Sequence, residues 1–134
     1  HFLGPVLEKR IEPLKENLRP HGTLSSFSFS LSQILAFPEA KNPRVIVLAG
    51  ATGNSPLSYL YSQIKLGLTE IGFSTEERIF IPHITLFRLK NSGASMTPLS
   101  IPPLTFKIEE FALFESQLKN SRSQYQILET VSLK

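Results

Sequence analysis

The chain has 134 residues, 41% of them hydrophobic and 19% charged, which is long enough for one domain with a proper core and typical of a globular protein. It contains no cysteine, which excludes disulfides, thiol nucleophiles and cysteine metal sites, and we expect a cytoplasmic protein. No run approaches the roughly 18 apolar residues of a membrane span, and the net charge of +3 is compatible with a polyanionic partner without singling one out.

The chain begins with a short apolar segment and a helical pattern. Residues 2–4 have the character of the end of a strand. Apolar residues then recur at helical spacing over residues 7–18, where Pro13 either kinks the helix or lies close to its start. The segment 19–22, Arg-Pro-His-Gly, is expected to end this helix.

Two strands and a second helix are predicted next. Phenylalanine and leucine alternate with serine over residues 26–31, which predicts a half-buried strand, and residues 44–48 form a short apolar one. The helix over residues 56–71 has the clearest apolar stripe. Ser55 suits its N-cap, and Gly72 suits its C-terminal stop.

The second half of the chain is dominated by strands. An apolar, β-branched strand covers residues 81–89, and a loop rich in serine and proline is expected over residues 91–105. Two further strands are predicted near residues 106–118 and 125–133. The set predicts an α+β domain built on antiparallel sheets, with helices covering one face.

The stretch with the most chemistry is His-Ile-Thr-Leu at positions 83–86, inside the predicted strand. Residues two apart in a strand point to the same face, so the imidazole of His83 and the hydroxyl of Thr85 project side by side. This pair suits the binding of one small polar group, such as a phosphate, while a proton moves. Taken alone, a strand histidine is more often structural, and Thr85 is simply a good strand residue.

The pattern His-x-Thr-Leu occurs again at positions 21–24, but in a different setting. Pro20 and Gly22 flank His21, and no apolar strand runs through the segment, so nothing holds this imidazole in register. We interpret His21 as a loop histidine outside the site. The role of His1, at the first position, is left open.

Other catalytic patterns are missing from the sequence. It contains no GxGxxG, Walker, HExxH or nucleophile-elbow motif. The histidines are 20 and 62 residues apart and no carboxylate cluster accompanies them, so we expect neither a metal site nor a cofactor. Glu109 and Glu110 are adjacent, and adjacent strand residues face opposite ways, so a bulge or a solvated edge is expected there.

Residues 80–90, FIPHITLFRLK, resemble the second signature of the 2H phosphoesterases, specifically the bacterial and archaeal 2'-5' RNA ligase-like RNA cyclic phosphodiesterases. Residues 68–73 resemble the helix end that precedes this signature, and residues 111–116 resemble the family's C-terminal strand pair. Residues 2–4, Phe-Leu-Gly, resemble the segment after the first His-x-Thr-Leu signature. These segments cover nearly the whole chain in the family's order.

The resemblance implies a bilobal fold in which two antiparallel sheets flank a central cleft and helices cover the outer faces. In this family two His-x-Thr motifs face each other. One histidine is the general base for the attacking water or hydroxyl, and the other protonates the leaving oxygen of a 2',3'-cyclic phosphate. The threonines hold non-bridging phosphate oxygens, and no metal is required. Two imidazoles near their ordinary pKa can be held in opposite protonation states at neutral pH.

Carried over to this chain, the resemblance implies catalytic and phosphate-holding roles for His83 and Thr85. It suggests that Arg88 contacts the phosphate and that Phe2 contacts a base. A strict pleat would aim Arg88 away from His83, so its role needs strand twist, a bulge or a long reach. The alternative is that Phe2 packs in the core and Arg88 lies on a solvated edge.

The resemblance places the first His-Thr pair immediately before residue 1. We therefore expect residues 1–134 to be a single 2H domain that is N-terminally incomplete. The complete parent is expected to be a monomer that hydrolyses the 2',3'-cyclic phosphate of RNA or a nucleotide to a 2'-phosphate, with reversible 2'-5' RNA ligation as a side activity. Two alternatives stay open: a non-catalytic RNA-end or nucleotide-binding module, and a purely structural His83 in a shared fold.

Overall fold

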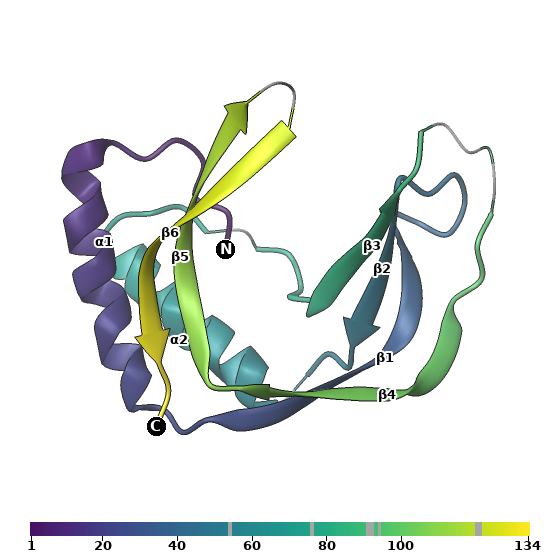
Figure 1. Ribbon diagram of the computed structural model, residues 1–134, viewed down its shortest axis with the longest axis horizontal. Helices are drawn as coiled ribbons and strands as arrows, with labels where there is room; N and C mark the ends of the chain where they lie inside the picture. Colours follow the sequence, from purple (N-terminus) through teal and green to yellow (C-terminus); the bar gives the residue numbers. More distant parts are fainter. Residues whose placement is uncertain (54, 76, 91–92, 94, 120–121) are drawn as a thin grey trace. The chain divides into compact units, whose positions relative to one another are not determined.

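The computed structural model describes residues 1–134 except 54, 76, 91–92, 94 and 120–121 (Figure 1). The chain divides into two compact units. Unit 1 comprises His1–Phe27, Tyr59–Arg78 and Ile108–Lys134, and unit 2 comprises Ser28–Ser58 and Ile79–Lys107. In chain order the elements are η1 (Glu8–Arg10), α1 (Ile11–Leu18), η2 (Arg19–Thr23), β1 (Phe27–Phe37), β2 (Val45–Gly50), α2 (Pro56–Glu70), β3 (His83–Arg88), β4 (Leu99–Ile108), β5 (Glu110–Lys119) and β6 (Arg122–Ser132).

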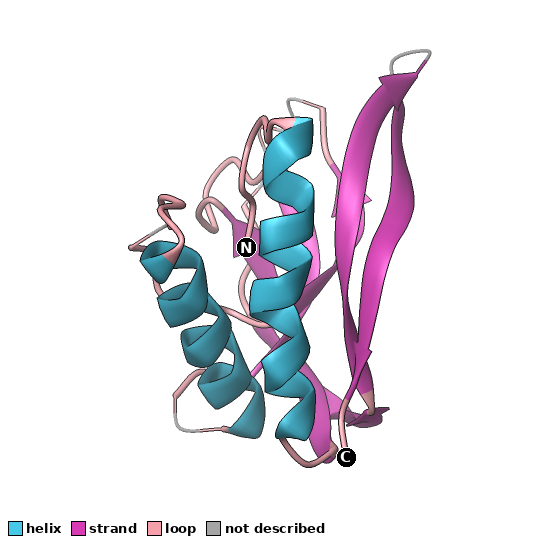
Figure 2. Cartoon of the chain, turned by 90° about the vertical axis from the view of Figure 1, so that its left-hand side faces the viewer, coloured by secondary structure: helices cyan, strands magenta, loops and turns pink. Residues whose placement is uncertain are grey.

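Unit 1 packs its helices against an antiparallel hairpin of β5 and β6 (Figure 1, Figure 2). The cross-strand pair of Phe111 and Val131 shares one face of the hairpin with Leu113. This face meets the apolar stripes of the two helices. The buried core residues are Leu14, Leu18, Leu68, Phe73 and Val131.

Both ends of α2 follow the sequence prediction. The backbone N–H of Ser58 donates to Oγ of Ser55 at 3.1 Å, which is the expected N-cap. At the other end Gly72 has φ +77°, and its N–H donates to the carbonyl of Thr69. Gly72 suits this position because the left-handed conformation is strained for residues with a Cβ.

The N-terminal part of the chain settles one open alternative and corrects two expectations. Pro13 lies in the first turn of α1, where its missing N–H removes no intrahelical bond, so the helix starts near the proline. Residues 19–23 continue as the 3-10 helix η2 instead of an open loop. Residues 2–4 were expected to end a strand, but they form none in the structure, because a strand needs a hydrogen-bonded neighbour.

Unit 2 is built on a four-stranded sheet in the order β3-β2-β1-β4, in which β1 and β2 are central. The pairings of β1 with β2 and of β2 with β3 are antiparallel. Val47 and Ala49 of β2 are fully buried. Strand β2 is therefore an apolar central strand, and the strands beside it are positioned by pairing with it. The expected α+β fold with antiparallel sheets is confirmed.

The loop predicted over residues 91–105 is wrong in its second half, where β4 forms, and positions 91–92 and 94 lie outside the described residues. Prolines 102 and 103 suggested a loop because they cannot donate to a sheet. They are tolerated because β4 is an edge strand, where one side needs no donors. The strand predicted near residues 106–118 is two strands, since Glu109 separates β4 from β5 and its carbonyl accepts the N–H of Leu133.

Candidate functional site

His83 is the first residue of β3, at an edge of the sheet of unit 2. It pairs with Ala49 of β2, and Thr85 pairs with Val47. Since directly paired residues share a face, His83 and Thr85 project from the same face, as the sequence predicted. Both residues are exposed.

A bulge in β3 brings Arg88 to this face as well. The register shifts between Ile46 and Val47 of β2, and Leu86 is the extra residue on β3. Beyond the bulge Arg88 pairs with Val45, which shares the face of Val47. The objection that a strict pleat aims Arg88 away from His83 is thereby removed. His83, Thr85 and Arg88 form one polar row on this face, which we name the β3 face.

The imidazole of His83 is held by two contacts. Its Nδ1 lies 2.7 Å from the carbonyl oxygen of Ile81, and the ring of Phe37 meets it edge-on with centroids 5.4 Å apart. A carbonyl oxygen can only accept a hydrogen bond, so Nδ1 carries the proton of this bond. This leaves Nε2 as the nitrogen that can exchange a proton with a bound group.

The backbone around His83 is fixed by the neighbouring strand. The N–H of Gly50 donates to the carbonyl of Pro82 at 2.9 Å. A Cβ at Gly50 would lie 2.3 Å from the ring of Phe29, so this position has no room for a side chain. The close approach of β1 and β2 therefore supports the start of β3, where the histidine stands.

Phe2 lies in unit 1, and 77% of its surface is exposed. The alternative that Phe2 packs in the core is therefore wrong. It lines a pocket of about 740 Å³ in unit 1, together with residues 1 and 3–6, Ile11, Leu14, residues 112–116, Tyr125 and Leu128. His1 stacks on Tyr61 with ring centroids 4.1 Å apart, and its Nε2 donates to the carbonyl of the same residue.

His21 lies in η2 of unit 1 and is partly buried. Its Nε2 is buried and has no hydrogen-bond partner within the part of the chain that the structure describes. Burial lowers the pKa of His21 below its ordinary value. His21 therefore lies on an element other than β3, and its packed imidazole supports the interpretation that it is not part of the site.

Over the described residues, no group of three or more histidine and acidic side chains is placed to hold a metal ion. Within the same residues no helix has the length and apolar character needed to cross a membrane. Sequence reasoning missed the carbonyl of Ile81 and the ring of Phe37, and it named a bulge only as one of three ways to bring Arg88 to the face of His83, without locating it at Leu86. The first two are contacts of the folded chain, and a one-residue register shift leaves no mark in an apolar pattern.

The fold and the β3 face define an α+β protein of the two-sheet class with a His-x-Thr strand. Residues 52–125 match the family model described as LigT like Phosphoesterase. The RNA 2',3'-cyclic phosphodiesterase of Thermotoga maritima is 33% identical over 133 residues, covering 95% of this chain and 70% of that protein. The protein of the same name in Bacillus subtilis is 30% identical, covering 90% of this chain and 67% of its own length.

Comparison with solved structures supports the same assignment. The protein TT0787 of Thermus thermophilus has a TM-score of 0.85 and 27% identity, covering 98% of this chain and 74% of that one. E. coli LigT in complex with 3'-AMP has a TM-score of 0.76 and 25% identity, covering 99% and 74%. The chain belongs to the LigT-like phosphoesterase family. The resemblance inferred from residues 80–90 is confirmed, and so is the prediction of an enzyme.

Proposed function

We propose that the β3 face is one half of an active site that hydrolyses the 2',3'-cyclic phosphate of RNA or a nucleotide to a 2'-phosphate. The observation that carries this proposal is the common face of His83, Thr85 and Arg88, with the imidazole already oriented. Two relatives at 33% and 30% identity carry the name RNA 2',3'-cyclic phosphodiesterase, which supports the choice of substrate.

The chemistry assigns a role to each group. Water attacks the phosphorus and gives a proton to a general base, while the bond from phosphorus to the 3' oxygen breaks and that oxygen takes a proton from a general acid. Nε2 of His83 performs one of these two transfers. The hydroxyl of Thr85 donates to a non-bridging oxygen, and the guanidinium of Arg88 balances the added charge of the transition state.

The second proton transfer needs a second group. We propose that a His-x-Thr motif preceding residue 1 supplies it, and that this motif and the present chain form one 2H domain that acts as a monomer in the cytoplasm without a metal. Reversible 2'-5' ligation follows from the same chemistry, because an RNA hydroxyl takes the place of water. In joining, the two histidines keep the acid and base roles of hydrolysis, and they swap these roles only in the reverse cleavage of the 2'-5' bond.

The test uses the full-length protein, EDTA and an oligoribonucleotide that ends in a 2',3'-cyclic phosphate. We expect ring opening by the wild type and a loss of about 10²- to 10⁴-fold in kcat/KM for His83→Ala. His21→Ala is the matched control, since it removes the other histidine of a His-x-Thr-Leu pattern and is expected to keep activity. No ring opening by the wild type, or full activity of His83→Ala, would contradict the proposal. Tight binding without hydrolysis would instead identify a non-catalytic RNA-end module.

A further inference from the structure

The charge of the chain is divided unequally between its two units. Unit 2, which comprises Ser28–Ser58 and Ile79–Lys107, contains five lysines and arginines and one acidic residue, and its formal charge is +4. Unit 1 contains nine basic and ten acidic residues, and its formal charge is −1. The positive excess of the chain therefore lies in the unit that carries the β3 face.

Four of the five cations of unit 2 gather where β3 ends and β2 begins. Arg88 is the last residue of β3 and pairs with Val45, the first residue of β2. Just beyond this pair, the N–H of Leu89 donates to the carbonyl of Arg44 at 2.8 Å. We give the name basic end to the three cations that lie beyond Arg88, which are Lys41, Arg44 and Lys90.

The loop between β1 and β2 is held against the segment that follows β3. Lys41 forms an isolated antiparallel bridge with Ser95. The N–H of Met96 donates to the carbonyl of Ala40 at 2.9 Å. The backbone between these contacts and β2 is anchored by Pro43, which is fully buried. The three cations of the basic end therefore stand on one folded part of unit 2, although they come from two separate segments of the sequence.

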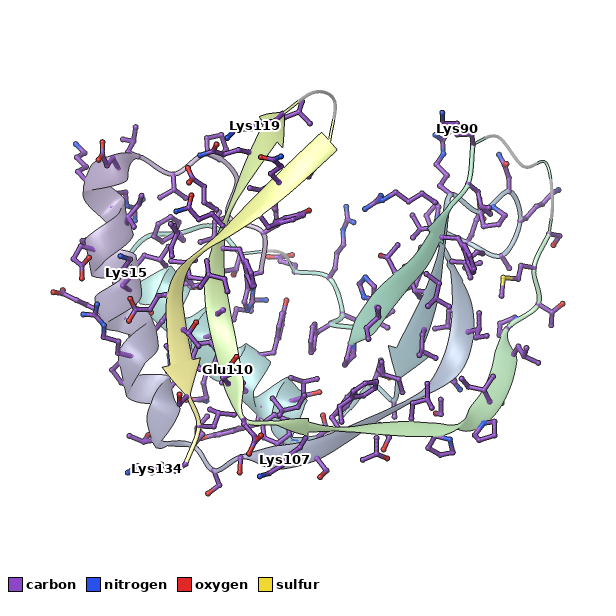
Figure 3. All side chains as sticks on the ribbon, viewed as in Figure 1. Lys15, Lys90, Lys107, Glu110, Lys119 and Lys134 are labelled. Carbon is purple, nitrogen blue, oxygen red and sulfur yellow. The ribbon has the colours of Figure 1, made fainter. Side chains whose placement is uncertain are left out.

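The side chains of the basic end are available to a ligand. All three are exposed, and none of them forms a salt bridge within the residues that the structure describes. Unit 2 contains a single acidic residue, Glu39, so their charge is not balanced within the unit. Lys90 lies beyond the end of β3, whereas Lys107, the fifth cation, lies on β4, the other edge strand (Figure 3). A group of uncompensated cations of this kind suits a polyanion.

The position of the basic end next to the β3 face indicates which polyanion it binds. Arg88 belongs to the polar row of the β3 face, and the next residue is hydrogen-bonded to Arg44, so the basic end continues this row past the end of β3. A 2',3'-cyclic phosphate is the 3' end of an RNA strand, and all other phosphates of the strand lie on its 5' side. A guanidinium binds a phosphate through parallel hydrogen bonds, and a lysine binds it as a point charge.

We propose that the basic end binds a backbone phosphate of the RNA strand on the 5' side of the cyclic phosphate. This inference rests on the proposed function, which assigns the 3' end of the strand to the β3 face of the same unit. It makes a strand of several nucleotides a better substrate than a cyclic mononucleotide, which has no second phosphate. Contacts to phosphate carry no sequence information, so the preference concerns length and not base identity.

The test compares two substrates of the full-length protein, a pentaribonucleotide that ends in a 2',3'-cyclic phosphate and a 2',3'-cyclic mononucleotide. We expect the double variant Arg44→Gln/Lys90→Gln to lower the ratio of their kcat/KM values about 3- to 10-fold, because the contact is made with the longer substrate alone. Lys107→Gln is the matched control. It removes a positive charge from the same unit, on the other edge strand, and should leave the ratio unchanged.

Fluorescence anisotropy with the same pentaribonucleotide ending in a 3'-hydroxyl separates this inference from the proposed function. If the protein opens no cyclic phosphate, but the double variant binds the strand more weakly than Lys107→Gln does, the basic end stands and the proposed hydrolysis fails. The slope of the logarithm of the binding constant against the logarithm of the salt concentration should also become about 0.7 less steep in the double variant, since one phosphate contact is lost.

Three outcomes would overturn the basic end as an RNA site. The first is an unchanged ratio together with unchanged binding in the double variant. The second is an equal loss of kcat/KM on both substrates, since the cations would then act on the cyclic phosphate or on the fold. The third is displacement of the pentaribonucleotide by polyglutamate at an equal concentration of charge, which would identify a surface for acidic proteins.

Discussion

The imidazole of His83 is oriented before any substrate binds. The carbonyl of Ile81 accepts its Nδ1 proton, and the edge-on contact with Phe37 limits rotation of the ring. Fixing one nitrogen of an imidazole determines which nitrogen reacts, as it does for histidines that bind metals. The backbone two residues before the histidine thus takes the orienting role that a carboxylate has in many other sites.

His21 offers a test of stability against pH. Burial lowers its pKa below the ordinary value of 6.5, so the unfolded chain binds this proton more readily than the folded chain. The free energy of unfolding should therefore fall as the pH decreases below about 6.5. In urea titrations at pH 7.5 and 5.5, His21→Gln should lose less stability than the wild type over this interval. An equal loss in both proteins would show that His21 does not couple folding to pH.

At the scale of elements, the spacing of apolar residues predicted α2 well, and the sequence also identified the strand of His83. The sequence pattern failed where pairing with a neighbouring strand decides the structure. Prolines 102 and 103 lie in a strand because that strand is at an edge, and Arg88 shares the face of His83 because Leu86 is bulged. Both facts concern pairing between segments that are distant in sequence.

The packing of β1 against β2 makes Gly50 a sensitive position. A methyl group there would meet the ring of Phe29 and the backbone oxygen of Ser30, which lies 2.8 Å from an added Cβ. We expect Gly50→Ala to lower the free energy of unfolding by about 1–3 kcal/mol, as overpacking does in other cores. Chemical denaturation measures this loss.

Phe29→Leu in the Gly50→Ala background provides the control. If the clash with the ring causes the loss, the smaller side chain should recover part of it, and the double-mutant cycle should show a coupling between the two sites. Additive effects would place the cause in the backbone of Ser30.

At the scale of the whole molecule, the sequence predicted the fold class and the family, because residues 80–90 and the order of the segments are local features of the chain. The resemblance implied two lobes, but the residues that belong to each unit could not be predicted from local features. Unit 1 is assembled from three separate segments and unit 2 from two, so the membership of each residue depends on long-range contacts. The same holds for the pairing of Phe114 with Ile127 across the β5–β6 hairpin.

The charge balance of the chain predicts a weak response of RNA binding to salt. The net charge is +3, and its lysines and arginines are scattered along the sequence. If the protein neutralises two phosphates of a single strand, the logarithm of the binding constant falls with the logarithm of the salt concentration with a slope of about −1.4. Binding of a pentaribonucleotide to the full-length protein should then weaken only about 5- to 10-fold between 50 and 200 mM salt. A loss of about 10³-fold would indicate a dominant electrostatic interface and contradict this expectation.

The bulge at Leu86 also bears on the tendency of this strand edge to aggregate. Residues 83–88 read His-Ile-Thr-Leu-Phe-Arg, an uninterrupted β-forming hexamer that contains no proline. They form an edge strand among the described strands, with Phe87 63% exposed. A flat edge of this composition invites pairing with the same edge of another molecule, the first step toward aggregation. The extra residue breaks the regular spacing of the exposed backbone groups, so the irregularity that assembles the polar row also protects against intermolecular β-sheet growth.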